Sequence, residues 1–452
     1  MRVSALPSLA HVITPSLRAS NEVRIERSAI AGTSLARARG ARVRTGLRQV
    51  AHLVPAMLVG CGAPPGFEVG DVEYRGPAGS SAPALAVAGT DLLMSFTEPT
   101  PDGRHAVRIA RRSDAGWQVV GTPVENDSLF VNWADFPSVT ALADGRWLAH
   151  WLQKTAPSTY AYHVRMALSA DEGTTWSAPF SPHGDRSATE HGFVATMPMA
   201  EGAAFVWLDG RNTGGEAGDG HGGEHAGTAG AMTLRYTTLG GAGVPNPDIE
   251  LDGRVCDCCQ TDLARTSSGL VAVYRDRSEA EIRDIAVVRW ADGAWMPSRK
   301  VSEDGWHYPG CPVNGPAVAA MGDTVAVAWY TAAHGVPAVY AAFSTDGGDT
   351  FGSRIRIDEG RPTGRVDLVA LGDGAVAVSW IEETDTDGEI RLRRVGLVSG
   401  AGASQLVAPT ETARAAGFPR MARLGNVIAL AWTEVGGDGG VRVMTLRVPG
   451  GS

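Results

Sequence analysis

The sequence has no run of apolar residues approaching the ~18 that a membrane-spanning helix needs. It also has no extended basic tract: 40 Lys and Arg stand against 49 Asp and Glu, a formal net charge of −9, which excludes the electrostatic footprint of a nucleic-acid-binding protein. The 57 glycines follow no strict period and no heptad pattern is sustained, which excludes collagen-like and coiled-coil chains. With 44% apolar and only 20% charged residues, the chain is too apolar for disorder and can bury a large core.

The charge is distributed unevenly along the chain. Residues 1–60 hold nine Arg and two acidic residues, a charge of +7, so residues 61–452 carry −16. An Arg-rich stretch at 37–44 precedes the short apolar run 50–60 and then Cys61, which is the pattern of an export signal. The ending LVGC at 58–61 resembles the lipobox of bacterial lipoproteins, in which the Cys is lipidated and becomes the first mature residue.

The predicted organisation follows from this segment. We expect residues 1–60 to be an N-terminal extension with an export signal, Cys61 to carry a lipid, and residues 61–452 to form one domain. The protein is then a monomer in the cell envelope, facing the periplasm or the outside, and touches the membrane only through its anchor. The alternative is an ordinary secretory signal followed by a chance Cys.

The rest of the chain contains a repeat. Seven times, a short apolar strand and a Gly or Asp turn precede a second strand that ends in an aromatic residue, and these aromatics are 51 to 67 residues apart. The second strands end at Phe96, Trp151, Trp207, Tyr274, Trp329, Trp380 and Trp432. Short alternating strands at this spacing are typical of the four-stranded antiparallel blades of an all-β propeller, here seven blades, with six possible. The last unit shows only three strands, so residues 67–74 are predicted to supply its outer strand and close the ring.

Two turns carry a further signature. Residues 169–176 read SADEGTTW and residues 344–351 read STDGGDTF. Both resemble the Asp-box of the sialidase (BNR repeat) superfamily, and with the blade pattern this resemblance covers about residues 67–452. In such a turn the Asp accepts backbone N–H groups and the Gly permits a positive φ. The turns therefore predict a fold and not a function.

The repeat sorts residues by face, because loops before the first strand and after the second strand of a blade open on the same side. Polar residues and cysteines concentrate in these loops, mostly in three adjacent blades, and loop faces of propellers bind ligands. They are Glu190, His191, Asp209, Arg211, Cys256, Cys258, Cys259, Asp276, Arg277, His307, Cys311 and Arg420.

Four of the five cysteines belong to this group. Cys256, Cys258 and Cys259 precede the first strand of one blade, and Cys311 precedes that of the next. Thiolates with an imidazole from His191 or His307 suit a soft metal, copper(I) or zinc(II). Outside the cytoplasm, disulfides are an equally reasonable outcome, with a bridge from Cys311 to the triplet, and a redox-reactive thiol is a third.

The superfamily resemblance implies its own chemistry: three Arg that bind a sialic acid carboxylate, a Tyr nucleophile activated by a Glu, and an Asp acid/base. Arg211, Arg277 and Arg420 with Asp209 and Asp276 are the candidates. The family's Arg-Ile-Pro segment is absent, its catalytic domains have six blades, and the sequence identifies no Tyr–Glu pair. The Asp and Arg residues then brace the fold.

Three hypotheses result for the cysteine-bearing face. The first is a soft-metal site with copper or zinc as cofactor. The second is an exo-glycosidase of the sialidase type, or a glycan-binding module. The third is a disulfide-braced interaction scaffold. The expected partner is accordingly a metal ion, a small ligand or a glycan, and no nucleic acid.

Overall fold

The computed structural model describes residues 66–214 and 230–449. The chain divides into two units, Met1–Cys61 and Gly62–Ser452. The predicted export signal and Cys61 lie outside the described residues. Within the described part, no helix has the length and apolarity to cross a membrane.

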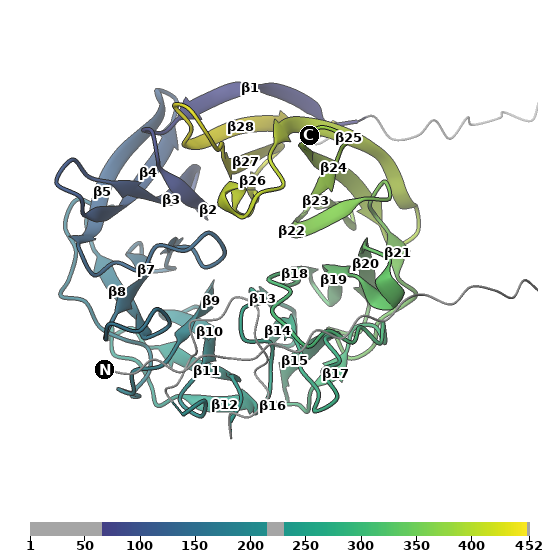
Figure 1. The fold of residues 1–452 in the computed structure, drawn as a ribbon, viewed down its shortest axis with the longest axis horizontal. Coiled ribbons are helices and arrows are strands. Elements are labelled where there is room, and N and C mark those ends of the chain that lie inside the picture. The colour runs from purple at the N-terminus through teal and green to yellow at the C-terminus, as the bar shows by residue number, and fades with distance from the viewer. Residues whose placement is uncertain (1–65, 215–229, 450–452) are drawn as a thin grey trace, which may run out of the picture. The chain divides into compact units, whose positions relative to one another are not determined.

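The second unit is a ring of seven antiparallel sheets, the seven-bladed propeller predicted from the repeat (Figure 1). The first three blades are β2 (Ser81–Ala88) to β5 (Gly116–Asn126) with β3 (Asp91–Pro99) and β4 (His105–Ser113) between them; β6 (Ser138–Ala141), β7 (Trp147–Lys154) and β8 (Tyr162–Ser169); and β9 (His191–Pro198), β10 (Ala203–Asp209), β11 (Thr233–Leu239) and β12 (Ile249–Asp252).

The remaining blades continue around the ring. The fourth has β13 (Asp262–Arg265), β14 (Leu270–Arg275), β15 (Ile285–Ala291), β16 (Ala294–Trp295) and β17 (Arg299–Lys300); the fifth has β18 (Ala317–Met321), β19 (Thr324–Thr331), the 3-10 turn η1 (Ala333–Gly335), β20 (Ala338–Ser344) and β21 (Ile355–Arg356). The sixth has β22 (Pro362–Ala370), β23 (Ala375–Glu383), β24 (Gly388–Gly396) and β25 (Gly400–Thr410); the turn η2 (Arg414–Ala416) leads to the seventh, with β26 (Arg420–Leu424), β27 (Val427–Thr433) and β28 (Val441–Arg447).

The ring closes as predicted. The N-terminal strand β1 (Glu68–Arg75) pairs antiparallel with β28 and supplies the outer strand of the seventh blade. This pairing joins the two ends of the domain and covers the edge of β28. Two blades depart from the four-strand pattern: the second has three strands, with a single Met166–Phe180 bridge in the outer position, and the fourth has two short outer strands.

The aromatic residues that end the second strands form the packing between blades. Trp207, Trp329 and Trp380 have no exposed surface, and each lies in a cluster that includes side chains of the preceding blade. Their indole N–H groups donate to buried acids: Trp207 to Asp209, at 2.9 Å, and Trp329 to Asp304, at 2.7 Å. The repeated aromatic residue therefore packs neighbouring blades against each other, because a large aromatic side chain buries the most surface where two sheets face each other.

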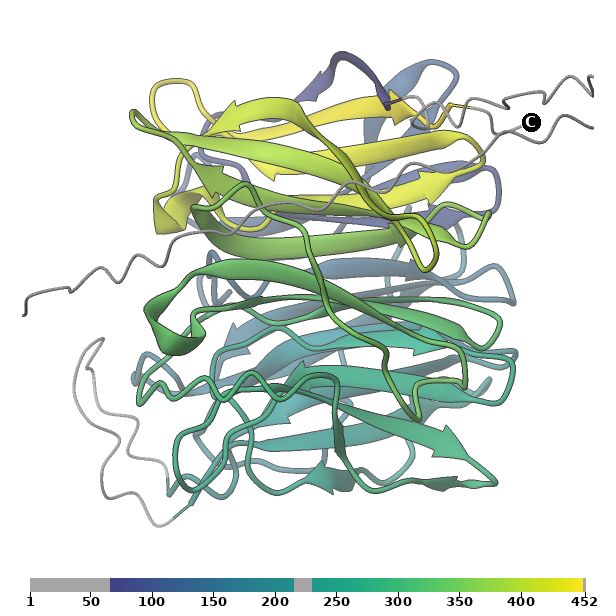
Figure 2. The same ribbon diagram turned by 90° about the vertical axis from the view of Figure 1, so that its right-hand side faces the viewer.

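Both Asp-box turns form the same set of hydrogen bonds. Asp171 accepts the backbone N–H and the hydroxyl of Thr175, at 2.8 and 2.7 Å, and Asp346 accepts the same groups of Thr350, at 2.9 and 2.6 Å. Each turn follows the third strand of its blade. The strands run from one face of the ring to the other (Figure 2), so these turns lie on the face opposite the loops that carry the cysteines.

Candidate functional site

The cysteines lie in the loops that enter the fourth and fifth blades. Cys256 and Cys259 are buried and form a disulfide with their Cα atoms 5.8 Å apart, well inside the usual range for such bonds. The bridge thus forms within the triplet and does not use Cys311, in contrast to the disulfide pairing considered from the sequence. A CxxC spacing brings the two Cα atoms to this distance, whereas adjacent cysteines would strain the ring.

Cys258 and Cys311 are free thiols that interact with each other. Burial raises the pKa of Cys258, and a hydrogen bond with Cys258 lowers the pKa of Cys311. The Cys258 sulfur also lies 4.0 Å from that of Cys256. The sulfur atoms of Cys256, Cys258 and Cys259 all lie within 4.8 Å of one another, and Cys311 reaches this group through Cys258.

A network of ion pairs holds the cysteine loop. The Arg277 guanidinium contacts both carboxylate oxygens of Asp257, at 2.9 and 3.1 Å, and binds Glu281 at 2.9 Å on its other side. Arg283 donates to the same Glu281, at 2.6 Å. Since Asp257 lies between Cys256 and Cys258 in the chain, Arg277 fixes the loop and has little capacity left for a ligand carboxylate.

The two histidines considered as additional ligands lie elsewhere. His307 is exposed and forms a β-bridge with Ile282, and no hydrogen bond or ring contact in the described residues joins it to a cysteine. His191 is fully buried, with its Nε2 atom 3.0 Å from Asp185 Oδ2 and 3.5 Å from Asp209 Oδ2. The structure places His191 beside carboxylates and shows no contact of either histidine with a cysteine in the part of the chain that it describes, so their role as additional ligands stays a prediction from the sequence.

The other predicted catalytic residues form separate pairs. Arg211 is bidentate on Asp209, at 2.8 and 2.7 Å, and Asp276 pairs with Lys300, at 2.6 Å. Arg420 begins β26, 3.5 Å from Asp367 and over the ring of Phe136. Arg211, Arg277 and Arg420 thus each have their own acidic partners and form no common carboxylate site.

The structure reveals a Tyr–Glu pair that the sequence analysis missed. Tyr162 Oη donates to Glu190 Oε1 at 2.5 Å, and its ring is buried and stacks on Phe130 with the centroids 4.1 Å apart. Burial raises the pKa of both Tyr162 and Glu190. The available signal was positional: Tyr162 begins a third strand and Glu190 precedes the first strand of the next blade, and these positions share a face.

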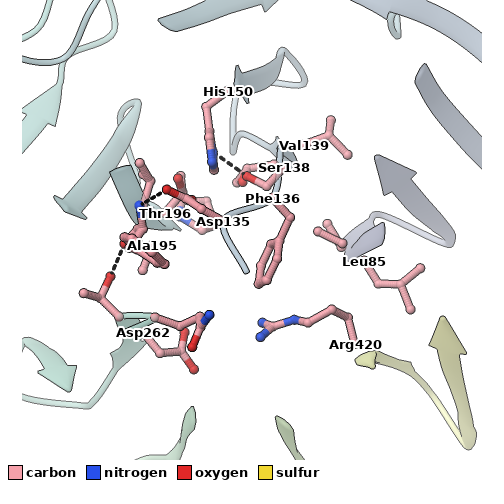
Figure 3. Close-up of a pocket in the computed structure, with 18 of the residues that line it drawn as sticks. Leu85, Asp135, Phe136, Ser138, Val139, His150, Ala195, Thr196, Asp262 and Arg420 are labelled. Carbon is pink, nitrogen blue, oxygen red and sulfur yellow. Dashed lines mark hydrogen bonds between the residues drawn. The ribbon is translucent and has the colours of Figure 1, made fainter. Parts of the chain in front are cut away.

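A central cavity of about 370 Å³ lies between the inner strands of five blades (Figure 3). Asp135, Asp262 and Arg420 are its charged lining residues. Asp135 accepts the N–H of Phe193 at 2.7 Å and Asp262 that of Val318 at 2.8 Å, so each carboxyl group joins its blade to the next. Burial raises the pKa of Asp135 to about 7 and that of Asp262 to about 6. These acids are braces of the ring.

Three solved structures illustrate what this chain is similar to. No protein-family model matches the sequence, and no curated protein matches it. A protein of unknown function from Dyadobacter fermentans is similar in structure, with a TM-score of 0.49 and 14% identity over 85% of this chain and 100% of that one. An α-L-arabinofuranosidase from Fusarium graminearum has a TM-score of 0.46 and 15% identity, covering 84% and 96%. The NanB sialidase of Streptococcus pneumoniae has a TM-score of 0.42 and 10% identity, covering 84% and 94%. Likeness at this level transfers no activity to this chain.

Proposed function

We propose that the protein binds a soft metal ion, copper(I) or zinc(II), through the cysteines that enter its fourth and fifth blades. One observation carries the proposal: the sulfur atom of Cys258 lies within 4.8 Å of both sulfur atoms of the Cys256–Cys259 disulfide. Cys311 interacts with Cys258 and adds a fourth sulfur from the next blade. The repeat does not require Cys311 of the fifth blade to lie beside Cys258 of the fourth.

The donor atoms suit a soft metal ion. Thiolates bind copper(I) and zinc(II), and four cysteines can complete a zinc site without imidazole, which fits the absence of any contact of His191 or His307 with these cysteines in the described residues. The disulfide between Cys256 and Cys259 is the oxidised, metal-free form of the site. Two electrons from an external dithiol reduce it to two thiols, which then lose protons to the solvent as the metal binds.

The surroundings support a preformed site. Arg277 holds Asp257 within the cysteine loop, and Arg283 is anchored on Glu281 beside it. Their positive charges favour the thiolate of Cys311, whereas burial raises the pKa of Cys258. Export and lipid attachment at Cys61 remain predictions from the sequence, and an oxidising compartment outside the cytoplasm fits the presence of a disulfide.

Elemental analysis tests the proposal. The purified protein is reduced with a dithiol without air, loaded with copper(I) against a competing chelator, desalted and analysed. We expect about one equivalent of copper, lost in Cys258→Ser and in Cys311→Ser. Cys61→Ser is the matched control and retains the metal. Absence of copper and of zinc from the reduced wild-type protein contradicts the proposal.

A second function is favoured by the Tyr162–Glu190 hydrogen bond. Such a pair matches the nucleophile and base that the superfamily resemblance implies, and it would make the protein a glycosidase. We rank it second because the Tyr162 ring is buried and the three candidate arginines do not converge. Release of the fluorophore from an α-sialoside by the wild-type protein, and its loss in Tyr162→Phe, would support this function.

A further inference from the structure

A second cluster of metal-ligand side chains lies between the second and third blades, apart from the cysteines. His163 is the second residue of β8, His191 begins β9, and His183 and Asp185 lie in the segment between these strands. The imidazole centroids of His163 and His191 are 4.6 Å apart, and those of His183 and His191 are 4.2 Å apart. Asp209, at the end of β10, completes the group.

Backbone carbonyls determine which nitrogen of each ring carries the proton. Nε2 of His163 lies 2.8 Å from Ser187 O, and Nδ1 of His191 lies 3.2 Å from Thr189 O. A carbonyl oxygen can only accept, so these nitrogens are N–H donors. In the neutral rings, Nδ1 of His163 and Nε2 of His191 then carry lone pairs. Histidines that bind metals are oriented in this way, with the second nitrogen donating to a carbonyl or carboxylate.

The Nε2 atom of His191 is the strongest indication of a missing ligand. The side chain has no exposed surface, and no hydrogen bond from the described part of the chain satisfies this atom. Its close neighbours are carboxylate oxygens, Asp185 Oδ2 at 3.0 Å and Asp209 Oδ2 at 3.5 Å. A lone pair and a carboxylate repel at this distance unless a cation lies between them. Two ligands on one zinc ion, each about 2.0–2.1 Å from it, are about 3.3 Å apart in tetrahedral geometry.

We propose that His163, His191 and Asp185 bind a divalent cation of the zinc class. One ligand atom from each of these residues lies within 4.8 Å of the other two. Asp209 already accepts hydrogen bonds from Trp207 and Arg211, so it adds negative charge beside the site without binding the ion, and His183 supports the ring of His191 by stacking. Three protein ligands leave a fourth position for water or a small ligand, and Asp185 is the partly exposed side of the site.

This site differs in chemistry from the cysteine cluster. Nitrogen and oxygen donors suit zinc(II), whereas the thiolates suit copper(I). The competing explanation is a protonated His191 in an ion pair with Asp185 and Asp209, in which case no metal is needed. Binding measurements separate the two, because an imidazolium has no lone pair for a metal.

The test uses the purified protein in its oxidised form, with Cys258 and Cys311 blocked by N-ethylmaleimide, and titrates it with Zn²⁺ by calorimetry and with Co²⁺ by absorption. We expect about one equivalent of either ion, and visible Co²⁺ bands without a thiolate charge-transfer band. His163→Gln and Asp185→Asn should each lower the affinity by more than about tenfold. His334→Gln, an exposed histidine of η1, is the matched control and should bind as the wild type does.

Three results would overturn the proposal. One is that the thiol-blocked protein, with a native circular dichroism spectrum, binds neither ion; the cluster is then a His–Asp ion pair. The second is unchanged affinity in Asp185→Asn, whose side chain is 20% exposed and whose replacement should leave the fold intact even if His163→Gln does not. A thiolate charge-transfer band with Co²⁺ would assign the metal to the cysteines and also reject this site.

Discussion

Tyr162 Oη donates a 2.5 Å hydrogen bond to Glu190 Oε1, and this bond joins the third strand of the second blade to the loop that enters the third blade. It lies on the same face as the cysteine loop, and Asp257 and Cys311 contribute to the electrostatic environment of Glu190. The Tyr162–Glu190 pair therefore holds two blades together next to the cysteine loop.

Tyr162→Phe should destabilise the protein, because it leaves the Glu190 carboxyl group without its donor. We expect a loss of about 1–3 kcal/mol in the free energy of unfolding. Glu190→Gln retains an acceptor for the tyrosine hydroxyl and should cost less. Urea denaturation of the two variants measures the difference. Equal stability of Tyr162→Phe and wild type would show that the bond does not contribute to the fold.

Asp135 predicts a specific dependence of stability on pH. Burial raises its pKa from 3.8 to about 7, so the folded protein keeps a proton that the unfolded chain releases above pH 3.8. The stability that protonated Asp135 contributes to the fold is fully present below pH 3.8 and is lost as the pH rises to about 7. Asp135→Asn does not titrate, and its amide oxygen can still accept from Phe193. Relative to wild type, this variant should gain stability between pH 4 and 7, by about 4 kcal/mol at most.

Urea denaturation at a series of pH values measures this effect. The difference between Asp135→Asn and wild type isolates the one carboxyl group, since all other titrations occur in both proteins. Stability curves that stay parallel from pH 4 to 7 would show that Asp135 has an ordinary pKa in the folded state.

The disulfide and the free thiols predict a pattern of alkylation. In protein purified in air and denatured without reductant, Cys258 and Cys311 should react with iodoacetamide, and Cys256 and Cys259 should react only after reduction. Peptide mass spectrometry reads this directly. Protection of all four cysteines in metal-free protein would instead mean a second bridge, and would favour the braced scaffold over a metal site.

The Asp-box turns should affect stability and leave the site unchanged. Asp346→Ala removes the acceptor for the Thr350 N–H and hydroxyl, and we expect it to cost about 1 kcal/mol in an exposed turn. Copper binding should equal that of wild type, because the turn lies on the opposite face of the ring from Cys258. Loss of copper in a folded Asp346→Ala protein would contradict this assignment of faces.

Local pattern was enough to predict the fold. Alternating strands, the aromatic residues from Phe96 to Trp432 and the turns between them depend on neighbours within a few residues, and their spacing set the number of blades. The same regularity predicted that β1 closes the ring and that Cys256 and Cys311 enter adjacent blades. These properties repeat along the chain, so the spacing of the repeat and the direction of its strands are enough to predict them.

The partners of individual side chains could not be read in this way. Whether Cys259 pairs with Cys256 or with Cys311, whether Arg277 meets a ligand or Asp257, and whether His191 faces sulfur or the His163 ring depend on a few ångströms of loop path. His163, His191 and Asp209 come from different strands and are neighbours only after two blades pack together. The period of the repeat places such residues on one face, but the distances between them arise from three-dimensional packing, which no local pattern encodes.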